Sequence, residues 1–149
     1  MERTPAAVRH MVDEMIVRCR EAGMNVTPQR IAVYEALVRS EEHPTPEILF
    51  KRVKRSMPSL SLATIYKSLD ALERLGLVQA VEIDSDSRRY DANMSMHHHL
   101  VCTKCRNVID FYDETLDHVK PWRASRGFIP HSVTVKVLGL CARCAKLRR

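Results

Sequence analysis

The sequence predicts an α+β protein in which a winged helix-turn-helix precedes a smaller α/β domain. Two observations lead to this fold class. The first half of the chain has four segments with apolar residues at helical spacing, followed by a short hairpin pattern. The second half has short strand-like segments between two Cys-x-x-Cys pairs.

Three helices are expected before residue 60, because apolar side chains recur there every three or four positions. The first covers about residues 6–22 and carries Cys19 on its apolar face, where we expect a buried thiol. Thr27 and Pro28 suit the N-cap and the first position of the second helix. Pro46 can open the third helix, whose outer face is basic.

A fourth helix is expected after the N-cap residue Ser61, and Gly76 closes it. Strand-like segments flank the polar turn at residues 84–87 and predict a basic hairpin. This order indicates a winged helix-turn-helix with the fourth helix as the recognition helix for DNA and the hairpin as its wing. The alternative is a plain helical bundle with a solvated polar face. The side chains suited to phosphate and base-edge contacts are Ser61, Thr64, Tyr66, Lys67 and Arg88.

Two Cys-x-x-Cys pairs, Cys102/Cys105 and Cys141/Cys144, lie in the C-terminal half. Two residues between cysteines let both thiolates of a tight turn face one ion, so two such turns supply the four sulfurs of a tetrahedral zinc site. A pair of disulfides is the main alternative, but the chain begins with no signal-peptide pattern. A site of four thiolates has no open position, so we expect structural zinc rather than catalysis.

The C-terminal domain is expected to be a small α+β unit with a thin core of about fifty residues. Zinc and a second copy of the chain would complete that core, so a homodimer is expected. The alternating segment Val133–Val137 is a candidate for pairing across the two-fold axis. Strands are expected at 100–101, 108–112 and 133–138, where β-branched and apolar residues occur at strand length. A helix is expected between them at 116–124.

Charge and hydropathy restrict the classes of partner. The formal net charge of +6 points towards an anionic partner. No apolar run approaches the roughly 20 residues needed to span a bilayer, so we expect a water-soluble, cytoplasmic protein with no membrane partner. The predicted limits are 1–84 for the winged-helix DNA-binding domain, 85–96 for a hinge, and 97–149 for the dimerisation and metal-binding domain.

Three consecutive histidines precede the first cysteine pair on an expected strand. Alternate side chains of a strand point the same way, so His97 and His99 can share one ion while His98 faces elsewhere. Asp91 and Asp110 offer carboxylates close in sequence, and a mixed imidazole and carboxylate set suits Fe(II), Mn(II) or Zn(II). The alternative is a run of solvated histidines that binds no metal.

The chain resembles the ferric uptake regulator (Fur) family from near residue 5 to Leu147. The resemblance implies a homodimeric, metal-dependent transcriptional repressor, not an enzyme, that binds palindromic operators in double-stranded DNA. The segments that carry it are Asn25–Arg30, Glu42–Glu47, Ser61–Leu69, Ser87–Asp91, His97–Cys102 and Ile109–Phe111.

Carried over residue by residue, the family's regulatory metal site falls on His43, Asp91, His97, His99 and Asp110. Iron-uptake regulators usually have Glu at the position of Asp110, so the chain is similar to the peroxide-sensing PerR subgroup. In that subgroup bound Fe(II) catalyses oxidation of its own histidine ligands by peroxide, which makes His43 and His97 the expected sensors. The resemblance implies that an ion, Fe(II) or Mn(II), clamps the DNA-binding half to the rest of the chain.

Two positions depart from the family pattern. A further metal site of some members would need Met96, His98, Asp117 and Val133; Met96 and Val133 are poor or impossible ligands, so we expect that site to be absent or degenerate. Lys67 stands where Arg or Asn is common, and Lys lacks the two-pronged geometry of Arg, so the relatives' operator preference does not carry over directly.

Three alternatives stay open. The first is an iron-, zinc- or manganese-uptake repressor of the same family that uses the same clamp without oxidation chemistry. The second is a non-heme iron enzyme, because two histidines and a carboxylate with open positions also describe oxygenases. The third is a zinc-ribbon interaction module with no role on DNA.

Overall fold

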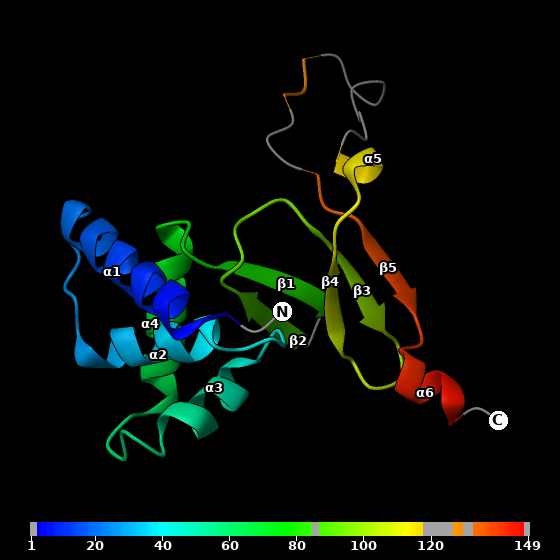
Figure 1. Cartoon of the computed structure of the whole chain (residues 1–149). Coiled ribbons are helices and arrows are strands. Elements are labelled where there is room, and N and C mark those ends of the chain that lie inside the picture. Colours follow the sequence, from blue (N-terminus) through cyan, green and yellow to red (C-terminus); the bar gives the residue numbers. More distant parts are fainter. Residues whose placement is uncertain (1–2, 85–86, 118–126, 130–132, 148–149) are drawn as a thin grey trace. The chain divides into compact units, whose positions relative to one another are not determined.

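The computed structural model describes residues 3–84, 87–117, 127–129 and 133–147 (Figure 1). The chain forms two compact units, an N-terminal unit (Met1–Met94) and a C-terminal unit (Ser95–Arg149). The boundary falls inside the segment predicted as a hinge, although β2 (Ser87–Asp91), which lies in the same segment, belongs to the N-terminal unit. None of the helices in the described ranges is long and apolar enough to cross a lipid bilayer.

The N-terminal unit begins with four helices, and each starts after a threonine or serine. The hydroxyl oxygen of that residue accepts a hydrogen bond from the backbone N–H three residues later, which satisfies one of the unpaired donors of the first turn. The N-caps predicted at Thr27 and Ser61 are thus confirmed. The helices are α1 (Pro5–Glu21), α2 (Pro28–Val38), α3 (Pro46–Val53) and α4 (Leu62–Arg74).

The core of this unit lies between the helices, where α2 packs against α1, α3 and α4. Val33, Ile65 and Leu69 are completely buried in it. Cys19 is also completely buried, as the sequence predicts, and burial raises the pKa of its thiol. After α4, Gly76 takes the left-handed backbone conformation (φ 62°) that turns the chain into the hairpin.

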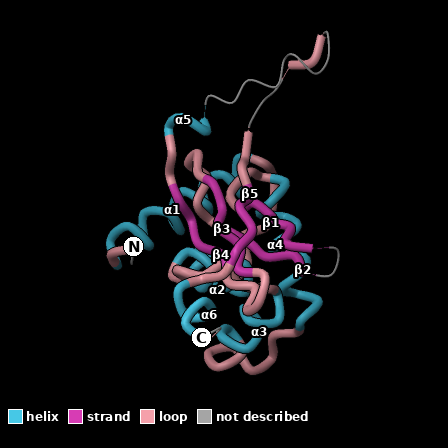
Figure 2. The backbone as a smooth tube through the Cα atoms, turned by 90° about the vertical axis from the view of Figure 1, so that its right-hand side faces the viewer, coloured by secondary structure: helices cyan, strands magenta, loops and turns pink. Residues whose placement is uncertain are grey.

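The predicted hairpin consists of β1 (Gln79–Asp84) and β2, paired antiparallel (Figure 2). The register places Val81 opposite Arg89 and Gln79 opposite Asp91. Asp91 therefore lies at the end of the hairpin away from the turn, beside the first residue of β1. Four helices with this two-stranded ribbon confirm the predicted winged helix-turn-helix.

The C-terminal unit is built on a three-stranded sheet in the order β4, β3, β5 (Figure 1). β3 pairs antiparallel with β4 and parallel with β5. The sequence prediction of a strand from Val133 was too early, because the strand starts at Lys136; the predicted helix 116–124 lies mostly outside the described residues. The elements are β3 (His98–Cys102), β4 (Val108–Phe111), α5 (Glu114–Asp117), β5 (Lys136–Gly139) and α6 (Ala142–Lys146).

Replacing the buried Val33 with alanine should lower the free energy of unfolding by about 2 kcal/mol, because two carbon groups leave the core and a cavity remains. Val17, which is 51% exposed on α1, offers the matched control, and Val17→Ala should change stability by less than about 0.5 kcal/mol. Denaturant unfolding followed by circular dichroism measures both variants. Equal effects would contradict the packing of α2 described above.

Candidate metal centres and nucleic-acid interface

The four cysteines of the two Cys-x-x-Cys pairs meet within the C-terminal unit. Cys102 ends β3 and Cys105 lies in the turn that follows, while Cys141 precedes α6 and Cys144 lies within it. Their four sulfur atoms all lie within 4.8 Å of one another, and the sulfurs of Cys105 and Cys141 are 3.7 Å apart. Zinc–sulfur bonds of about 2.3 Å in a tetrahedron require sulfurs about 3.8 Å apart. The cluster therefore fits a structural zinc site, and its cysteines are free thiols rather than disulfides.

The electrostatics of the cluster favour thiolates at two positions. Backbone N–H groups of Cys105 and Cys141 donate to the sulfur of Cys102 and lower its pKa to about 6. The N–H of Asn107 acts in the same direction on the pKa of Cys105. Burial instead raises the pKa of Cys144 to about 12. All four cysteines can therefore be thiolates together only beside a compensating cation, which a bound zinc ion would supply.

Purified protein dialysed against a mild chelator should retain one tightly bound zinc per chain, because a closed thiolate site releases zinc slowly. Cys141→Ser removes a ligand and should release that zinc, with loss of hydrogen-exchange protection in the strands of the C-terminal unit. Cys19→Ala removes the cysteine of α1 and should leave the zinc content unchanged. Elemental analysis measures the metal; full zinc in Cys141→Ser would contradict the assignment.

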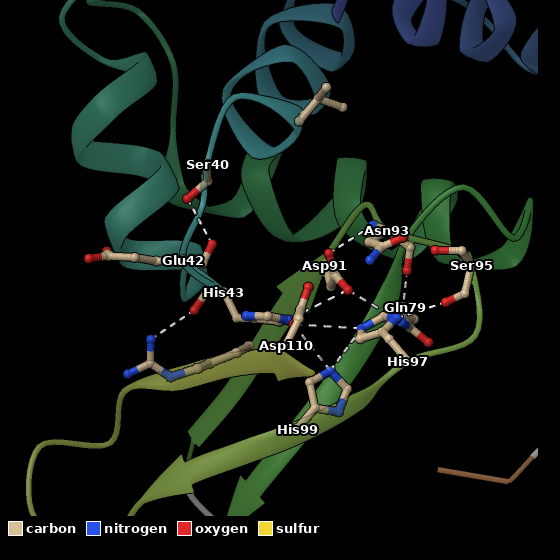
Figure 3. A network of polar contacts seen from close by, with 12 residues as sticks. Ser40, Glu42, His43, Gln79, Asp91, Asn93, Ser95, His97, His99 and Asp110 are labelled. Carbon is tan, nitrogen blue, oxygen red and sulfur yellow. Dashed lines mark hydrogen bonds and ion pairs between the residues drawn. The ribbon is translucent and has the colours of Figure 1, made fainter. Parts of the chain in front are cut away.

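A second group of metal-ligating side chains in the C-terminal unit joins β3 to β4. The register places His99 opposite Asp110, and His97 immediately precedes β3 (Figure 3). The Nε2 atoms of the two histidines lie 3.1 Å apart, and they lie 3.7 Å (His97) and 3.9 Å (His99) from the Oδ1 atom of Asp110. Two nitrogen ligands at about 2.1 Å from one ion and at right angles to each other are about 3 Å apart. The three side chains thus converge as metal ligands do.

The backbone fixes which nitrogen of His97 is available to a metal. Its Nδ1 atom lies 2.7 Å from the carbonyl oxygen of Ser95 (Figure 3). A carbonyl only accepts, so Nδ1 must carry the proton and donate, which leaves the lone pair on Nε2. A hydrogen bond of this kind orients the imidazole as a ligand before any metal arrives.

The N-terminal unit contributes a separate pair, His43 and Asp91. His43 lies in the loop between α2 and α3, Asp91 ends β2, and the Nε2 and Oδ2 atoms are 3.5 Å apart with both side chains buried (Figure 3). The amide of Gln79 donates to Oδ2 (3.3 Å), and the backbone N–H of Asn93 donates to Oδ1 (2.8 Å). The carboxylate is therefore held in place from both sides.

Sequence reasoning missed three residues that orient the predicted ligands: Gln79, Asn93 and Ser95. Asn93 and Ser95 each lie two residues from a ligand, a spacing typical of local side-chain and backbone hydrogen bonds. That spacing is a signal that the sequence does contain. Gln79 is twelve residues from Asp91, and only the hairpin register brings them together.

His98 faces away from the other two histidines, as its place in the strand predicts. It is completely buried, its Nδ1 atom accepts the N–H of Val135 (3.2 Å), and its ring packs on Phe111. Met96, a second residue of the expected degenerate site, is 45% exposed, and the side chain of Asp117 lies outside the described residues. The absence of a metal site here stays a prediction.

The residues predicted to contact DNA lie in two settings. Tyr66 and Lys67 are exposed on α4, and the Tyr66 hydroxyl donates to Oε1 of Glu47 (2.7 Å), which raises the pKa of the phenol. Thr64 is half-buried one turn from the N-cap Ser61, and their hydroxyl oxygens are 2.9 Å apart. Arg88 lies on β2, where it forms an ion pair with Glu73 (2.9 Å) that the sequence analysis did not anticipate.

A winged helix-turn-helix joined to a cysteine-stapled unit with histidine and carboxylate ligands defines a class of metal-responsive regulators. Residues 21–138 match the family model for the ferric uptake regulator family. The chain belongs to the ferric uptake regulator family, whose members are transcriptional regulators and not enzymes. This membership removes the non-heme iron enzyme from the alternatives.

Individual relatives support the same assignment. The peroxide operon regulator of Bacillus subtilis is 33% identical over 138 residues, which cover 92% of this chain and 95% of the relative. The peroxide stress regulator of Campylobacter jejuni is 29% identical with a TM-score of 0.67, covering 89% of this chain and 98% of that one. The ferric uptake regulator of Helicobacter pylori has the same fold, with a TM-score of 0.79 at 21% identity over 93% of each chain.

Proposed function

We propose that the chain is a homodimeric repressor that binds operator DNA when a regulatory metal is bound and releases it after peroxide oxidises a ligand. The observation that carries this proposal is the division of nitrogen and oxygen ligands between the two units. The N-terminal unit holds His43 and Asp91 in contact, and the C-terminal unit holds His97, His99 and Asp110.

One ion shared by these five side chains would act as a clamp. Only residues 92–96 separate Asp91 from His97, so the Cα atoms of these two residues are never more than about 22 Å apart. An ion bound by both sets fixes the recognition helix relative to the C-terminal unit. In a dimer it would set the distance between two recognition helices, which must be about 34 Å to read both halves of a palindrome.

The exposed face of the C-terminal sheet supports the homodimer. Leu100, Ile109 and Val137, which the strand register places side by side, are 38–45% exposed. Leu100, Ile109 and Val137 also line a mostly apolar cavity of about 320 Å³. Apolar area of this kind on so small a unit marks an interaction surface, and a second copy of the same sheet would cover it.

A repressor of this kind would act in the cytoplasm, where its DNA is.

The donor set fits Fe(II), Mn(II) or Zn(II), because it combines three imidazoles with two carboxylates. Five protein donors leave one position of an octahedron for a small molecule. Fe(II), when bound, would supply the electrons that activate hydrogen peroxide. In the net reaction one peroxide oxygen is added to an imidazole ring carbon and the other leaves as water. His43 and His97 are the sensors we propose, and an oxidised imidazole is a weaker donor that loosens the clamp.

Protein loaded with Fe(II) and treated with hydrogen peroxide should gain the mass of one oxygen atom on the peptide that contains His43 or the peptide that contains His97. Operator binding should fall in parallel, because a weakened ligand opens the clamp. Peptide mass spectrometry and a DNA-binding assay on the same sample measure both, with Mn(II)-loaded protein as the control that stays unmodified. If the mass and the operator binding of the Fe(II)-loaded protein stay unchanged, peroxide sensing is contradicted. That result would favour a metal-uptake repressor without oxidation chemistry.

Thr64→Ala combined with Lys67→Ala should weaken binding to a duplex enriched by the protein from random sequences in the presence of Mn(II). Lys67 contributes one phosphate contact per protomer in this proposal, so for the dimer the slope of log affinity against log salt should fall by about two. Lys146→Ala on α6 removes the same charge elsewhere and should leave binding as in the parent. A double variant that binds as tightly as the parent would favour an interaction module with no DNA role.

A further inference from the structure

Strand β2 of the hairpin is hydrogen-bonded to the loop that carries His43. The backbone N–H of Tyr90 donates to the carbonyl oxygen of Pro44 (3.1 Å). The Nη1 atom of Arg89 donates to the carbonyl oxygen of His43 (2.7 Å). Both bonds lie within the N-terminal unit and join segments 46 residues apart in the sequence.

We propose that Arg89 is a positioning residue that presets His43 for the regulatory metal and couples metal occupancy to the wing hairpin. The inference rests on the proposed function, because it concerns the same regulatory site. Arg89 touches no metal in this scheme; it acts through the backbone of a ligand.

The geometry shows why Arg89 reaches His43. Side chains two residues apart on a strand share a face, so Arg89 and Asp91 lie on the same face of β2. Arg89 binds the carbonyl of His43, while Asp91 lies against its imidazole at 3.5 Å. His43 is therefore held at its backbone and at its ring by two residues of one strand. Tyr90, between them, points the other way into the core and anchors the strand.

The chemistry of arginine matters at this position. A guanidinium to carbonyl hydrogen bond is charge-assisted and directional, and a lysine ammonium is a point charge without the planar fork. His43 lies outside regular secondary structure, in a segment of bends between α2 and α3. Without the bond from Arg89, part of the free energy of metal binding would be spent on ordering this loop. Mutating a residue that is hydrogen-bonded to a metal ligand typically changes metal affinity 10–100-fold.

The same bond links the metal site to the surface that we propose contacts DNA. Arg88, one of the proposed DNA contacts, precedes Arg89 on β2. A change at His43 that strains its carbonyl bond is therefore passed directly to the wing. Linkage is reciprocal, so if metal raises DNA affinity through this bond, DNA raises metal affinity by the same factor.

The test compares Mn(II) affinity of the full-length protein, its Arg89→Lys and Arg89→Gln variants, and Arg39→Lys as the matched control. Arg39 is exposed and paired with Glu35, so its substitution should leave affinity unchanged. Arg89→Lys should weaken Mn(II) binding at least tenfold while the melting temperature and zinc content stay those of the parent. In a His43→Ala background the Arg89 substitution should have no further effect on Mn(II) affinity.

An Arg89→Lys variant with parental affinity, or an equal loss in the His43→Ala background, would overturn the positioning role. Failure of the parent itself to bind Mn(II) would instead overturn the proposed function. A second measurement, hydrogen exchange, uses only the parent protein and so does not depend on the folding of any variant. Mn(II) should slow exchange of the Tyr90 amide at least tenfold and leave the exchange rate of the Val12 amide of α1 unchanged. An unchanged Tyr90 rate would also contradict the coupling.

Discussion

The hydrogen bonds between β2 and the His43–Pro44 loop hold together the part of the candidate regulatory site that the N-terminal unit supplies. Three consecutive residues of β2 serve three purposes: Tyr90 fills the core, Arg89 holds the loop, and Asp91 offers a carboxylate to a metal. The wing, part of the core and one of the five proposed regulatory ligands therefore share one strand. In our proposal a disturbance at His43 reaches the wing, because the strand that holds its loop also forms the wing.

The two candidate metal sites differ in whether they would stabilise the fold or regulate it. The buried apolar side chains that the structure describes in the C-terminal unit are only Val101, Cys102, Val108 and Cys144, and two of these are zinc ligands. So small a core is not expected to hold three strands and a short helix by itself, so zinc bound by the four cysteines would supply much of the stability of this unit. The candidate nitrogen and oxygen ligands are divided between the two units. Such a division suits a regulatory ion, because its binding and loss would change how the two units are coupled.

The local features of the fold could be predicted from the sequence, because each depends on a few neighbouring residues. Thr27 and Ser61 cap helices, Cys-x-x-Cys turns gather thiolates, and His97 and His99 share a face while His98 does not. The features that depend on register could not be predicted. Alternation in Val133–Val137 looks the same whether or not the segment pairs, and the parallel pairing of β5 with β3 from Lys136 left no local signal.

In the candidate regulatory site, His97, His99, Asp91 and Asp110 could be proposed from the residue pattern, whereas His43, which lies 48 residues before Asp91, was predicted only by family resemblance. The residues that orient its ligands, such as Gln79 and Arg89, become evident only when the hairpin and loop are placed together. The same is true of Arg88, whose ion pair with Glu73 must break or rearrange before this side chain binds a phosphate.

A crystal structure of the Mn(II)-loaded protein, with anomalous scattering recorded at the manganese and zinc edges, would show whether one ion joins the two units. We expect a manganese ion bound at once by His43 and Asp91 of the N-terminal unit and by His97, His99 and Asp110 of the C-terminal unit, with zinc at the four cysteines. Manganese held only by the C-terminal ligands, with the His43 imidazole directed into solvent, would contradict it.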